Sequence, residues 1–361
     1  LKSSTSFRSS YHCELEQMST QITLTRLYFN LPLFILFSVI HFKKDLTIDN
    51  NGCNNNTEME KKIEKAFSIF NGGEGLDHWS YSSTSTPFAK NLIGYTFPQE
   101  IRRKFAFRYK ANFGNLVNNV VQRMIADVIH KTKTIKQTEF TKEERELENC
   151  FNAELELINQ KPPVDAKDKF GRETMLKYAR DCIPITKKVV QDIIGKNKLV
   201  CERYVEKQEF GQVKPTIGRI DYETKELFIE LKTKPPNLKK VRGKDEWSMH
   251  TQDLPSEPTI ENLTQTSFYY MTTKKIPHLV YVNDKDYVIF DQSHELMKAD
   301  HLEFLYTKMV EKIMLWEKMI MFAEGKLETL AMMMEPPDLN HFFYYKDLAD
   351  EQKQLITKLW G

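Results

Sequence analysis

The sequence has no closely spaced cysteine pair. Its five cysteines are scattered and form no C-x-x-C motif: Cys13, Cys53, Cys150, Cys182 and Cys201. This spacing indicates neither a zinc ribbon nor an iron–sulfur cluster, and it is typical of a protein in a reducing compartment. The chain also has no G-x-x-x-x-G-K-[ST] phosphate-binding loop and no visible internal repeat. Any helicase that works with this protein is therefore a separate chain.

Neither sign of charge is in large excess. The 361 residues carry 52 Lys and Arg against 50 Asp and Glu, a net charge of +2. The protein is thus no general polycation, and a nucleic-acid surface on it must be a local patch. With 40% hydrophobic and 28% charged residues, the chain can bury a sizeable core, which argues against disorder. Its length allows one large or two modest domains.

The apolar stretch near the N-terminus is too short to span a bilayer. Leu31–Phe42 also contains Pro32 and His41, and no small-residue cleavage motif follows it. We interpret residues 1–58 as a translated AT-rich leader, with Met59 as the better start and 59–361 as one domain. The alternative is a genuine leader or membrane anchor. We expect a cytoplasmic protein of a bacterium or a phage-infected host, without stable membrane association. Mitochondrial or membrane targeting follows only if the first 58 residues are genuine.

Helical patterns dominate from about residue 79 to 195. A Ser/Thr-rich segment precedes a helix that we expect to begin near Pro87-Phe88, because serine and threonine are favoured N-cap residues. Apolar residues recur at three and four over Gly114–Lys131, which predicts an amphipathic helix. Residues 141–160 predict a charged, solvated helix, and Met175–Ile194 a further helix interrupted at Pro184.

Strand patterns follow, in a core from about 199 to 291. Leu199–Glu206, Lys214–Tyr222 and Glu226–Thr233 are the first three strands, and Pro235-Pro236 closes the third, because proline cannot continue a ladder. A basic loop comes next, with Lys239, Lys240, Arg242 and Lys244.

The C-terminal part returns to helices. Thr259–Thr273 predicts a helix, and His278–Asn283 with Tyr287–Asp291 predicts a hairpin. One long helix is expected from about His294 to Gly325, within a helical part spanning 292–361. This order predicts an α/β (or α+β) fold in which helices cover a small mixed sheet.

Three side chains on the second and third strands suggest a metal site. Asp221 lies near the end of one strand, and Glu230 and Lys232 lie two residues apart on the next, hence on one face. Two converging carboxylates can bind a divalent cation, and an adjacent ammonium suits phosphate chemistry. Gly218 indicates a close approach by another backbone or a ligand. Taken alone, such a short pattern is more often a solvated surface hairpin.

The connection between these strands decides whether the carboxylates can meet. If residues 223–226 form it, Asp221 pairs opposite Phe228, and Glu230 is a diagonal neighbour at roughly 7–8 Å. A turn at 222–225 would pair Asp221 with Glu226. The carboxylates would then be about 13 Å apart at ~3.3 Å per residue, too far for one cation. A metal site requires the wider connection or a bulge.

The following helix supplies two more polar side chains, Gln265 and Tyr269, four residues apart on one face. The order G-x-x-D, (D/E)-x-K and Q-x-x-x-Y resembles the PD-(D/E)XK nuclease superfamily, in its RecB-like and phage-exonuclease branch. The serine-rich segment Trp79–Phe88 is similar to that family's opening before its first helix. The resemblance covers about residues 79–291, and the order of the three motifs is more specific than any one of them.

The resemblance implies a restriction-endonuclease-like αβββαβ core and a Mg²⁺ or Mn²⁺ site. Asp221 and Glu230 would be ligands together with the backbone carbonyl of Leu231. Lys232 would be the catalytic lysine, Gln265 would orient that lysine or the phosphate, and Tyr269 would contact DNA.

One position departs from the family. Asn118 lies where the family often has a histidine ligand. An amide oxygen is a weaker ligand and would shift the preference from Mn²⁺ towards Mg²⁺. Alternatively, the alignment with the family motif is wrong at this position, and Gln122 or Asp127 contributes the ligand. Gln122 is favoured because it lies one turn after Asn118.

The sequence thus predicts a metal-dependent deoxyribonuclease, an exonuclease acting on single- or double-stranded DNA ends in recombination, replication or repair. A separate helicase or recombination protein would be a partner. The basic loop, with Arg102, Arg103, Arg108 and Lys110, would hold the phosphodiester backbone. The alternatives are a structure-specific or nicking endonuclease with the same site, and a DNA-binding protein whose site has decayed. Glu202 and Glu206 could lie near the metal, although solvated strand carboxylates are commoner. Trp247 could stack a base or pack half-buried.

Overall fold

The computed structural model describes residues 54–98, 108–130, 140–244, 246–336 and 350–361. The chain divides into two units, residues 1–60 and 61–361. Of the first unit, residues 54–60 are described, and they begin helix α3 (Asn54–Phe67), which contains Met59. The predicted leader stretch Leu31–Phe42 lies outside the described residues, as do Arg102 and Arg103.

The second unit is built on one mixed sheet. Its strands are β1 (Trp79–Ser80), β2 (Val128–Ile129), β3 (Val200–Lys207), β4 (Thr216–Glu223), β5 (Leu227–Thr233), β8 (Ile276–Val282) and β9 (Tyr287–Phe290). The spatial order is β2-β3-β4-β5-β8-β9, with β1 paired to β4. Strands β3, β4 and β5 pair antiparallel in succession, whereas β2 joins β3 in parallel and β8 joins β5 in parallel after a helical crossover.

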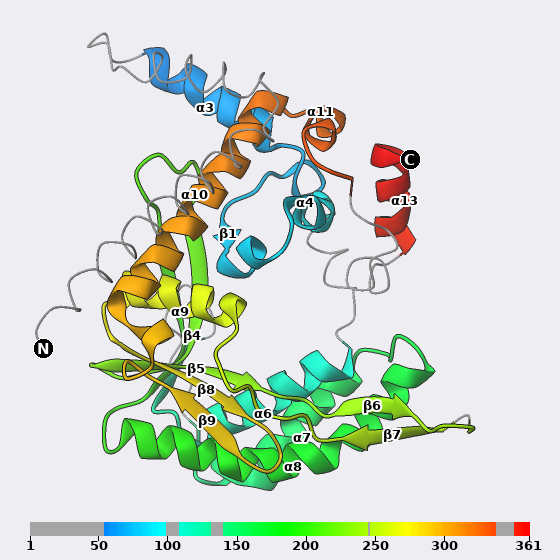
Figure 1. Ribbon diagram of the computed structural model, residues 1–361, viewed down its shortest axis with the longest axis vertical. Coiled ribbons are helices and arrows are strands. Elements are labelled where there is room, and N and C mark those ends of the chain that lie inside the picture. Colours follow the sequence, from blue (N-terminus) through cyan, green and yellow to red (C-terminus); the bar gives the residue numbers. More distant parts are fainter. Residues whose placement is uncertain (1–53, 99–107, 131–139, 245, 337–349) are drawn as a thin grey trace, which may run out of the picture. The chain divides into compact units, whose positions relative to one another are not determined.

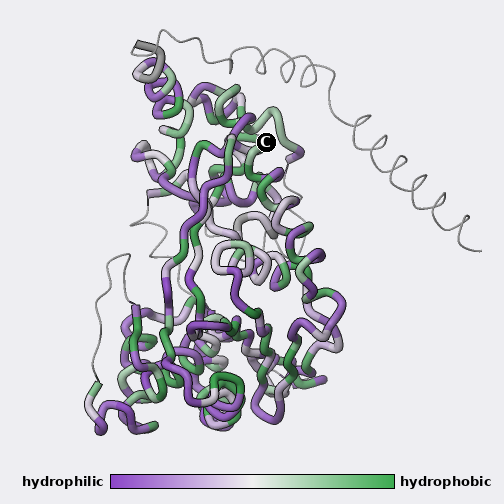
Figure 2. The backbone as a smooth tube through the Cα atoms, turned by 90° about the vertical axis from the view of Figure 1, so that its left-hand side faces the viewer, coloured by the Kyte–Doolittle hydropathy of each residue, from purple (hydrophilic) through white to green (hydrophobic). Residues whose placement is uncertain are grey.

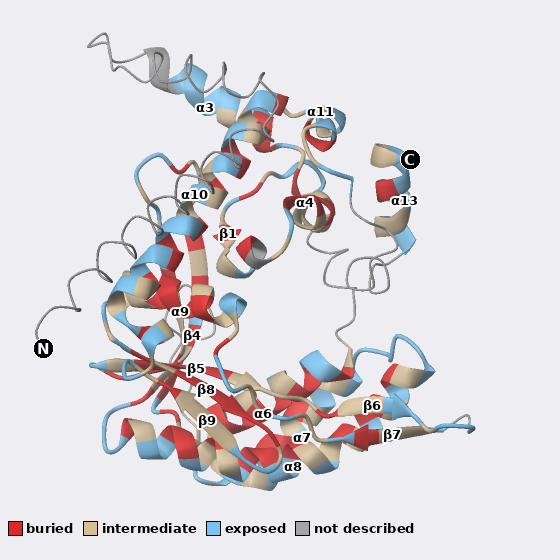
Figure 3. Ribbon diagram, viewed as in Figure 1, coloured by how far each residue is buried: buried red, intermediate tan, exposed pale blue. Residues whose placement is uncertain are grey.

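Helices flank this sheet on both faces (Figure 1). The described helices of the chain are, besides α3, α4 (Phe88–Thr96), α6 (Tyr109–Ile125), α7 (Leu147–Asn159), α8 (Ala166–Ile194), α9 (Ile260–Thr273), α10 (Ala299–Ala323), α11 (Leu327–Met332) and α13 (Asp350–Trp360). One hydrophobic core lies between the sheet and the helices α6 and α8, and a second lies between the sheet and the helices α9 and α10. Buried residues accordingly concentrate in β5 and β8 and on the adjoining helices (Figure 3). In its described residues the protein is a mixed α/β protein, with one seven-strand sheet and nine helices.

Hydrophobic residues recur at every second position in the strands and at every third or fourth position in the helices, and this periodicity favours the observed arrangement. Hydrophobic and hydrophilic residues alternate along the backbone over short distances (Figure 2), as expected of elements that bury one face. The first three predicted strands are confirmed as β3, β4 and β5 within one or two residues, and the predicted helix at Thr259–Thr273 is confirmed as α9. The hairpin β8–β9 and the long helix α10 are confirmed as well.

Two helical predictions are corrected. The helix predicted to reach Lys131 ends at Ile125, and Val128 and Ile129 pair in parallel with β3 instead. Both residues are β-branched and buried, so a sheet edge suits them as well as a helix does. Helix α8 begins at Ala166 and continues through Pro184 without interruption. Packing of its buried face against α6 outweighs the hydrogen bond that proline removes.

Three further expectations differ from the structure. The charged helix near 141–160 buries Cys150, Phe151 and Glu154, so it is only partly solvated. The serine-rich segment supplies no side-chain cap to α4: Tyr81–Ser85 is a 3₁₀ turn and Pro87 precedes the helix. The residues predicted to form a basic loop belong to a separate two-stranded hairpin, β6 (Asn237–Lys240) and β7 (Trp247–His250).

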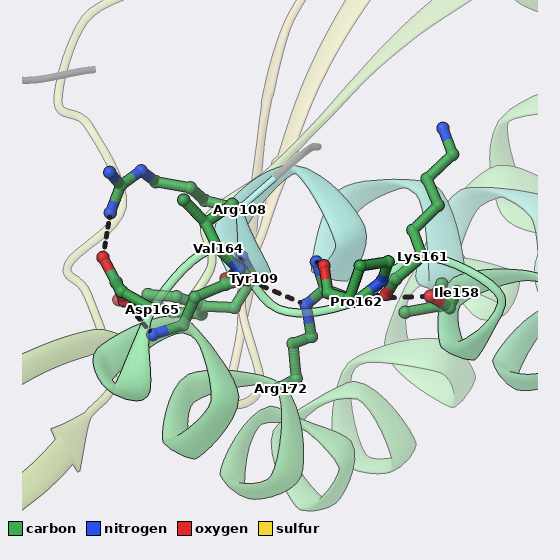
Figure 4. Close-up of polar contacts among 9 residues, drawn as sticks. Arg108, Tyr109, Ile158, Lys161, Pro162, Val164, Asp165 and Arg172 are labelled. Carbon is green, nitrogen blue, oxygen red and sulfur yellow. Dashed lines mark hydrogen bonds and ion pairs between the residues drawn. The ribbon is translucent and has the colours of Figure 1, made fainter. Parts of the chain in front are cut away.

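A polar cluster fixes the start of α8 against the start of α6 (Figure 4). Buried Asp168 accepts hydrogen bonds from the amides of Tyr109 and Val164 and from Arg172 Nε, the last at 3.0 Å. Arg172 Nη1 in turn donates to the carbonyl of Lys161 at 2.7 Å. Asp165 caps α8 by accepting from the Asp168 amide at 2.7 Å, and it pairs with Arg108 at 3.1 Å.

We expect Asp165→Ala to lower the free energy of unfolding by about 1 kcal/mol at pH 7, because the helix loses its cap. The hydrogen bond from the Asp168 amide lowers the pKa of Asp165 below its ordinary 3.8. A lowered folded-state pKa means that the contribution is complete above pH 3.8 and is lost as the pH falls through the folded value. Urea unfolding of parent and variant at several pH values measures this difference. Asp165→Asn keeps an acceptor but not the charge, so it should lose less stability than Asp165→Ala at neutral pH and show no such loss as the pH falls; equal stability of Asp165→Ala and the parent would contradict the capping role.

Candidate active site

Strand β5 holds Glu230 and Lys232 on one face, as the alternation predicts. Lys232 Nζ lies 2.7 Å from Glu230 Oε1 and 2.6 Å from Gln265 Oε1 of α9. Glu230 is buried, with 1% of its surface exposed, and Gln265 is buried with it. The lysine is therefore fixed between two oxygens that come from different elements, and Gln265 contacts it, one of the two roles that the resemblance implies for Gln265.

Asp221 of β4 joins them through a register that differs from the predicted one. The ladder pairs Tyr222 with Ile229 and Glu223 with Phe228. Phe228 is thus not opposite Asp221, and the predicted connection at 223–226 is wrong by one residue on each strand. One step further along this register, Asp221 is level with Glu230. Its Oδ2 accepts a hydrogen bond from the Leu231 amide at 2.9 Å, in place of a backbone partner.

A threonine explains the tighter turn. The Thr224 amide donates to the Leu227 carbonyl at 2.9 Å. Thr224 Oγ1 accepts from the amides of Glu226 and Leu227 at 3.3 and 3.2 Å. Threonine side chains stabilise turns in this way. Lys225 and Glu226 are left exposed at the tip of the hairpin. The predicted condition that the carboxylates meet only across a wider connection or a bulge is therefore wrong, because this tighter turn places Asp221 level with Glu230.

Tyr269, one turn after Gln265 on α9, positions the Gln265 side chain. Its hydroxyl accepts from Gln265 Nε2 at 3.1 Å and donates to the carbonyl of Arg219. The close approach at Gly218 is made by this ring and not by another backbone or a ligand as predicted, since a Cβ there would lie 2.6 Å from a ring carbon of Tyr269. Tyr269 is completely buried, so the structure gives it a positioning contact where the resemblance implies a contact with DNA.

Asn118 on α6 contacts the carboxylate of Asp221. Its Nδ2 donates to Asp221 Oδ1 at 3.2 Å, and its Oδ1 accepts from the Tyr222 hydroxyl at 2.6 Å. The amide oxygen, the atom that would bind a metal, thus faces Tyr222, and the contact with Asp221 is an orienting one. Asp127 lies elsewhere and accepts from the Leu199 amide at 2.7 Å.

Glu202 on β3 is a third carboxylate beside the pair. Gln122 Nε2 donates to its Oε1 at 2.7 Å, and Arg219 Nη1 lies 3.5 Å from its Oε2. Its backbone has a φ of 57°, a left-handed conformation that is uncommon for glutamate and often occurs at functional sites. The sequence named Glu202 and Gln122 only as alternatives; Arg219 was missed, although it shares the strand face of Asp221.

Tyr81 is the other residue that the sequence missed. Its ring stacks on Phe268, with centroids 6.3 Å apart, and meets Tyr269 edge-on at 5.6 Å. Burial raises the pKa of Tyr81 to about 12, and the charge of Glu230 adds to this effect. A neutral hydroxyl therefore borders the Glu230–Lys232 pair. The available signal was the serine-rich segment that contains Tyr81, which the resemblance already marked.

The two carboxylates are held in an unfavourable environment. Burial raises the pKa of Asp221 well above its usual range, and the charges of Glu230 and Glu202 raise it further. Burial also raises the pKa of Glu230, although Lys232 opposes the shift. Burial by itself lowers the pKa of Lys232, but Glu230, Tyr81 and Asp221 outweigh it and the net pKa is raised. Lys232 is accordingly an ammonium at neutral pH, suited to orienting and charge stabilisation.

One atom of this cluster has no partner. Among the described residues, Glu230 Oε2 is buried without a hydrogen bond. A buried, unpaired carboxylate oxygen beside a second carboxylate fits a cation, which would compensate both charges. In the described parts of the chain, no three His, Cys, Asp or Glu side chains converge to hold a metal ion. Mg²⁺ suits such a set, because it is usually bound by one or two carboxylates and keeps several waters.

Comparison with known proteins gave no relatives. No protein-family model matches this chain, and neither does any curated protein or solved structure. No helix within the described ranges is both long enough and apolar enough to cross a membrane.

Proposed function

We propose that this protein is a divalent-metal-dependent DNA nuclease with a restriction-endonuclease-like core. The single observation that carries the proposal is the placement of Lys232 between Glu230 and Gln265, next to Asp221. Four polar residues from two strands and a helix meet at one point, although burial disfavours their charges. The chain order α8, β3, β4, β5, α9, β8, with the hairpin β6–β7 inserted between β5 and α9, supports the αβββαβ arrangement that the sequence motifs imply.

Each residue has a role that its contacts support. Asp221, Glu230 and the carbonyl of Leu231 would hold Mg²⁺ or Mn²⁺, which when bound supplies Lewis-acid activation of water and of the phosphate. Asn118 and the Leu231 amide orient Asp221. Lys232 holds a positive charge where negative charge develops on the phosphate oxygens.

Three further residues, on α9 and in the turn before α4, surround the Glu230–Lys232 pair. Gln265 fixes the lysine, and Tyr269 fixes Gln265. Tyr81 closes one side of the pair with a neutral hydroxyl. These three residues need not touch the substrate to matter, since a shift of the lysine by about 1 Å can cost roughly 10²-fold in rate.

Action on DNA ends is the form of the activity that we propose, with an endonuclease as the alternative. A group of exposed positive side chains lies on β6 and its turn, which can hold a backbone without reading sequence. Covalently closed circular DNA separates the two forms: an exonuclease leaves it intact, whereas cleavage of the circle identifies an endonuclease.

Labelled single- and double-stranded DNA, incubated with Mg²⁺ or Mn²⁺, tests the proposal. We expect the parent protein to release nucleotides or fragments only when the metal is present. Glu230→Gln should lower the rate on the order of 10²- to 10³-fold, because a neutral amide replaces a ligand and the partner of Lys232. Glu226→Gln is the matched control on the same hairpin, at its exposed tip. A parent protein that binds DNA but never cleaves it would instead favour a decayed site.

A further inference from the structure

The hairpin β6–β7, residues 237–250, continues the strand that carries Glu230 and Lys232. Only residues 234–236 separate β5 from β6. In Figure 1 the hairpin, which we call the arm, prolongs the direction of β5 beyond the edge of α8. Two of the three linking residues are proline, Pro235 and Pro236, which restrict the backbone and stiffen the connection.

The base of the arm is fixed to α6 and α8. The Tyr109 hydroxyl donates to the Pro236 carbonyl at 3.3 Å and accepts from the Leu238 amide at 3.2 Å. Tyr178 of α8 donates to the Met249 carbonyl at 2.9 Å. The ring of Tyr109 lies against Gly171 of α8, where a Cβ would come within 2.5 Å of it. The arm is thus held at a defined position relative to the active-site strand.

The outer part of the arm is basic. Lys239, Lys240, Arg242 and Lys244 are exposed, and of the described acidic residues Glu246 lies nearby, 3.9 Å from Lys244. Lys167 of α8 lies 5.0 Å from the ring of Trp247, so this ring packs under a cation rather than standing free to stack a base. Lys110 of α6 bonds to Asn237 at the base of the arm. The helices therefore add positive charge beside the arm.

We propose that the arm is a fixed backbone clamp that binds DNA phosphates about seven nucleotides from the bond that is cut. The inference rests on the proposed nuclease function. Lys239 lies seven positions after Lys232 along the chain, which corresponds to about 23 Å at ~3.3 Å per residue for an extended backbone. Phosphates of one strand of B-DNA advance ~3.4 Å each along the axis, so this distance corresponds to about seven base pairs. The ligand is the sugar–phosphate backbone, because the exposed groups are cations and Trp247 is occupied.

Binding as a function of DNA length tests the clamp without cleavage. Fluorescence anisotropy is measured in EDTA with labelled duplexes of increasing length. The parent protein should bind markedly tighter once the duplex exceeds about seven base pairs, the reach of the arm. Lys239→Gln/Arg242→Gln should weaken binding of long duplexes on the order of 10-fold and lower the salt slope by about 2, while short duplexes are unaffected. Lys142→Gln/Lys318→Gln removes the same charge from exposed positions elsewhere and should bind as the parent does.

The outcomes separate the clamp from the nuclease. If the arm variant binds every length as tightly as the parent, or if both double variants lose affinity equally, the clamp is refuted even when the parent cleaves DNA. If length-dependent binding requires the arm but no metal supports cleavage, the nuclease proposal fails and the clamp stands as a DNA-binding surface. A few-fold loss of long-duplex affinity in Tyr109→Phe, with the salt slope unchanged, would support fixation of the arm at its base; an affinity equal to the parent's would refute the fixed geometry.

Discussion

Lys232→Ala is expected to lower the rate of DNA cleavage on the order of 10³-fold while the protein stays folded. The ammonium of Lys232 lies within 2.7 Å of Glu230 Oε1 and 2.6 Å of Gln265 Oε1. Its pKa is raised in the folded protein, so it carries a full charge at neutral pH. Removing a preorganised charge that faces a developing anion typically costs about 10²- to 10³-fold. Single-turnover cleavage of labelled DNA at saturating metal measures this loss.

The fold should survive because Glu230 can take up a proton. Burial already raises its pKa, and loss of Lys232 removes the charge that opposes this shift. Thermal unfolding and circular dichroism of the variant establish that the fold is retained. Lys225→Ala is the matched control, since Lys225 is exposed at the tip of the same hairpin. A folded Lys232→Ala protein that cuts at the parental rate would remove Lys232 from the site.

Glu317→Ala is expected to lower the free energy of unfolding by at least about 3 kcal/mol. Glu317 lies on α10 with 2% of its surface exposed. Its Oε1 accepts from Trp79 Nε1 at 2.9 Å and from the Lys214 amide at 2.8 Å, and its Oε2 accepts from the Val213 amide at 2.7 Å. Alanine would leave three donors without a partner, at about 1–3 kcal/mol each and not fully additive. Such a loss is a large fraction of the free energy of unfolding of a typical domain, which is about 5–15 kcal/mol.

Guanidinium chloride unfolding measures this effect. Glu311→Ala on the same helix is the control, because Glu311 is exposed and its ion pair is with Lys308, at 2.9 Å. Exposed pairs of this kind contribute about 0–1 kcal/mol. If Glu317→Ala and Glu311→Ala unfolded at the same denaturant concentration, the buried carboxylate would not be the link between α10, β1 and the segment before β4.

The two expected effects arise from two kinds of buried carboxylate. Glu317 is satisfied by three donors and joins the second core to the sheet. Glu230 is paired with Lys232 on one oxygen and left without a hydrogen bond on the other, within the described residues. Buried polar atoms are normally bonded. The second arrangement is therefore expected to serve binding more than stability.

Much of the candidate site followed from local periodicity. The alternation of β5 places Glu230 and Lys232 on one face, and the helical spacing of α9 places Gln265 and Tyr269 on one side. Both features depend only on residues close in sequence, so the chain alone predicts them. The register between β4 and β5 did not follow, because it depends on a turn closed by the Thr224 hydroxyl. One residue of error there exchanges the neighbours of Asp221.

The sequence by itself determined β3, β4, β5, the hairpin β8–β9, the helices α9 and α10, and the pairs of polar residues within β5 and α9, because these depend on periods of two and 3.6 residues. Only the tertiary structure decided which elements meet: Asn118 and Gln122 from α6, Glu202 from β3 and Tyr81 from the turn before α4 all reach the site over long stretches of chain. The left-handed backbone of Glu202 and the anchoring of the arm by Tyr109 likewise arise from packing between distant segments. No local pattern encodes such contacts, since their free energy comes from burial and hydrogen bonds formed after the elements assemble.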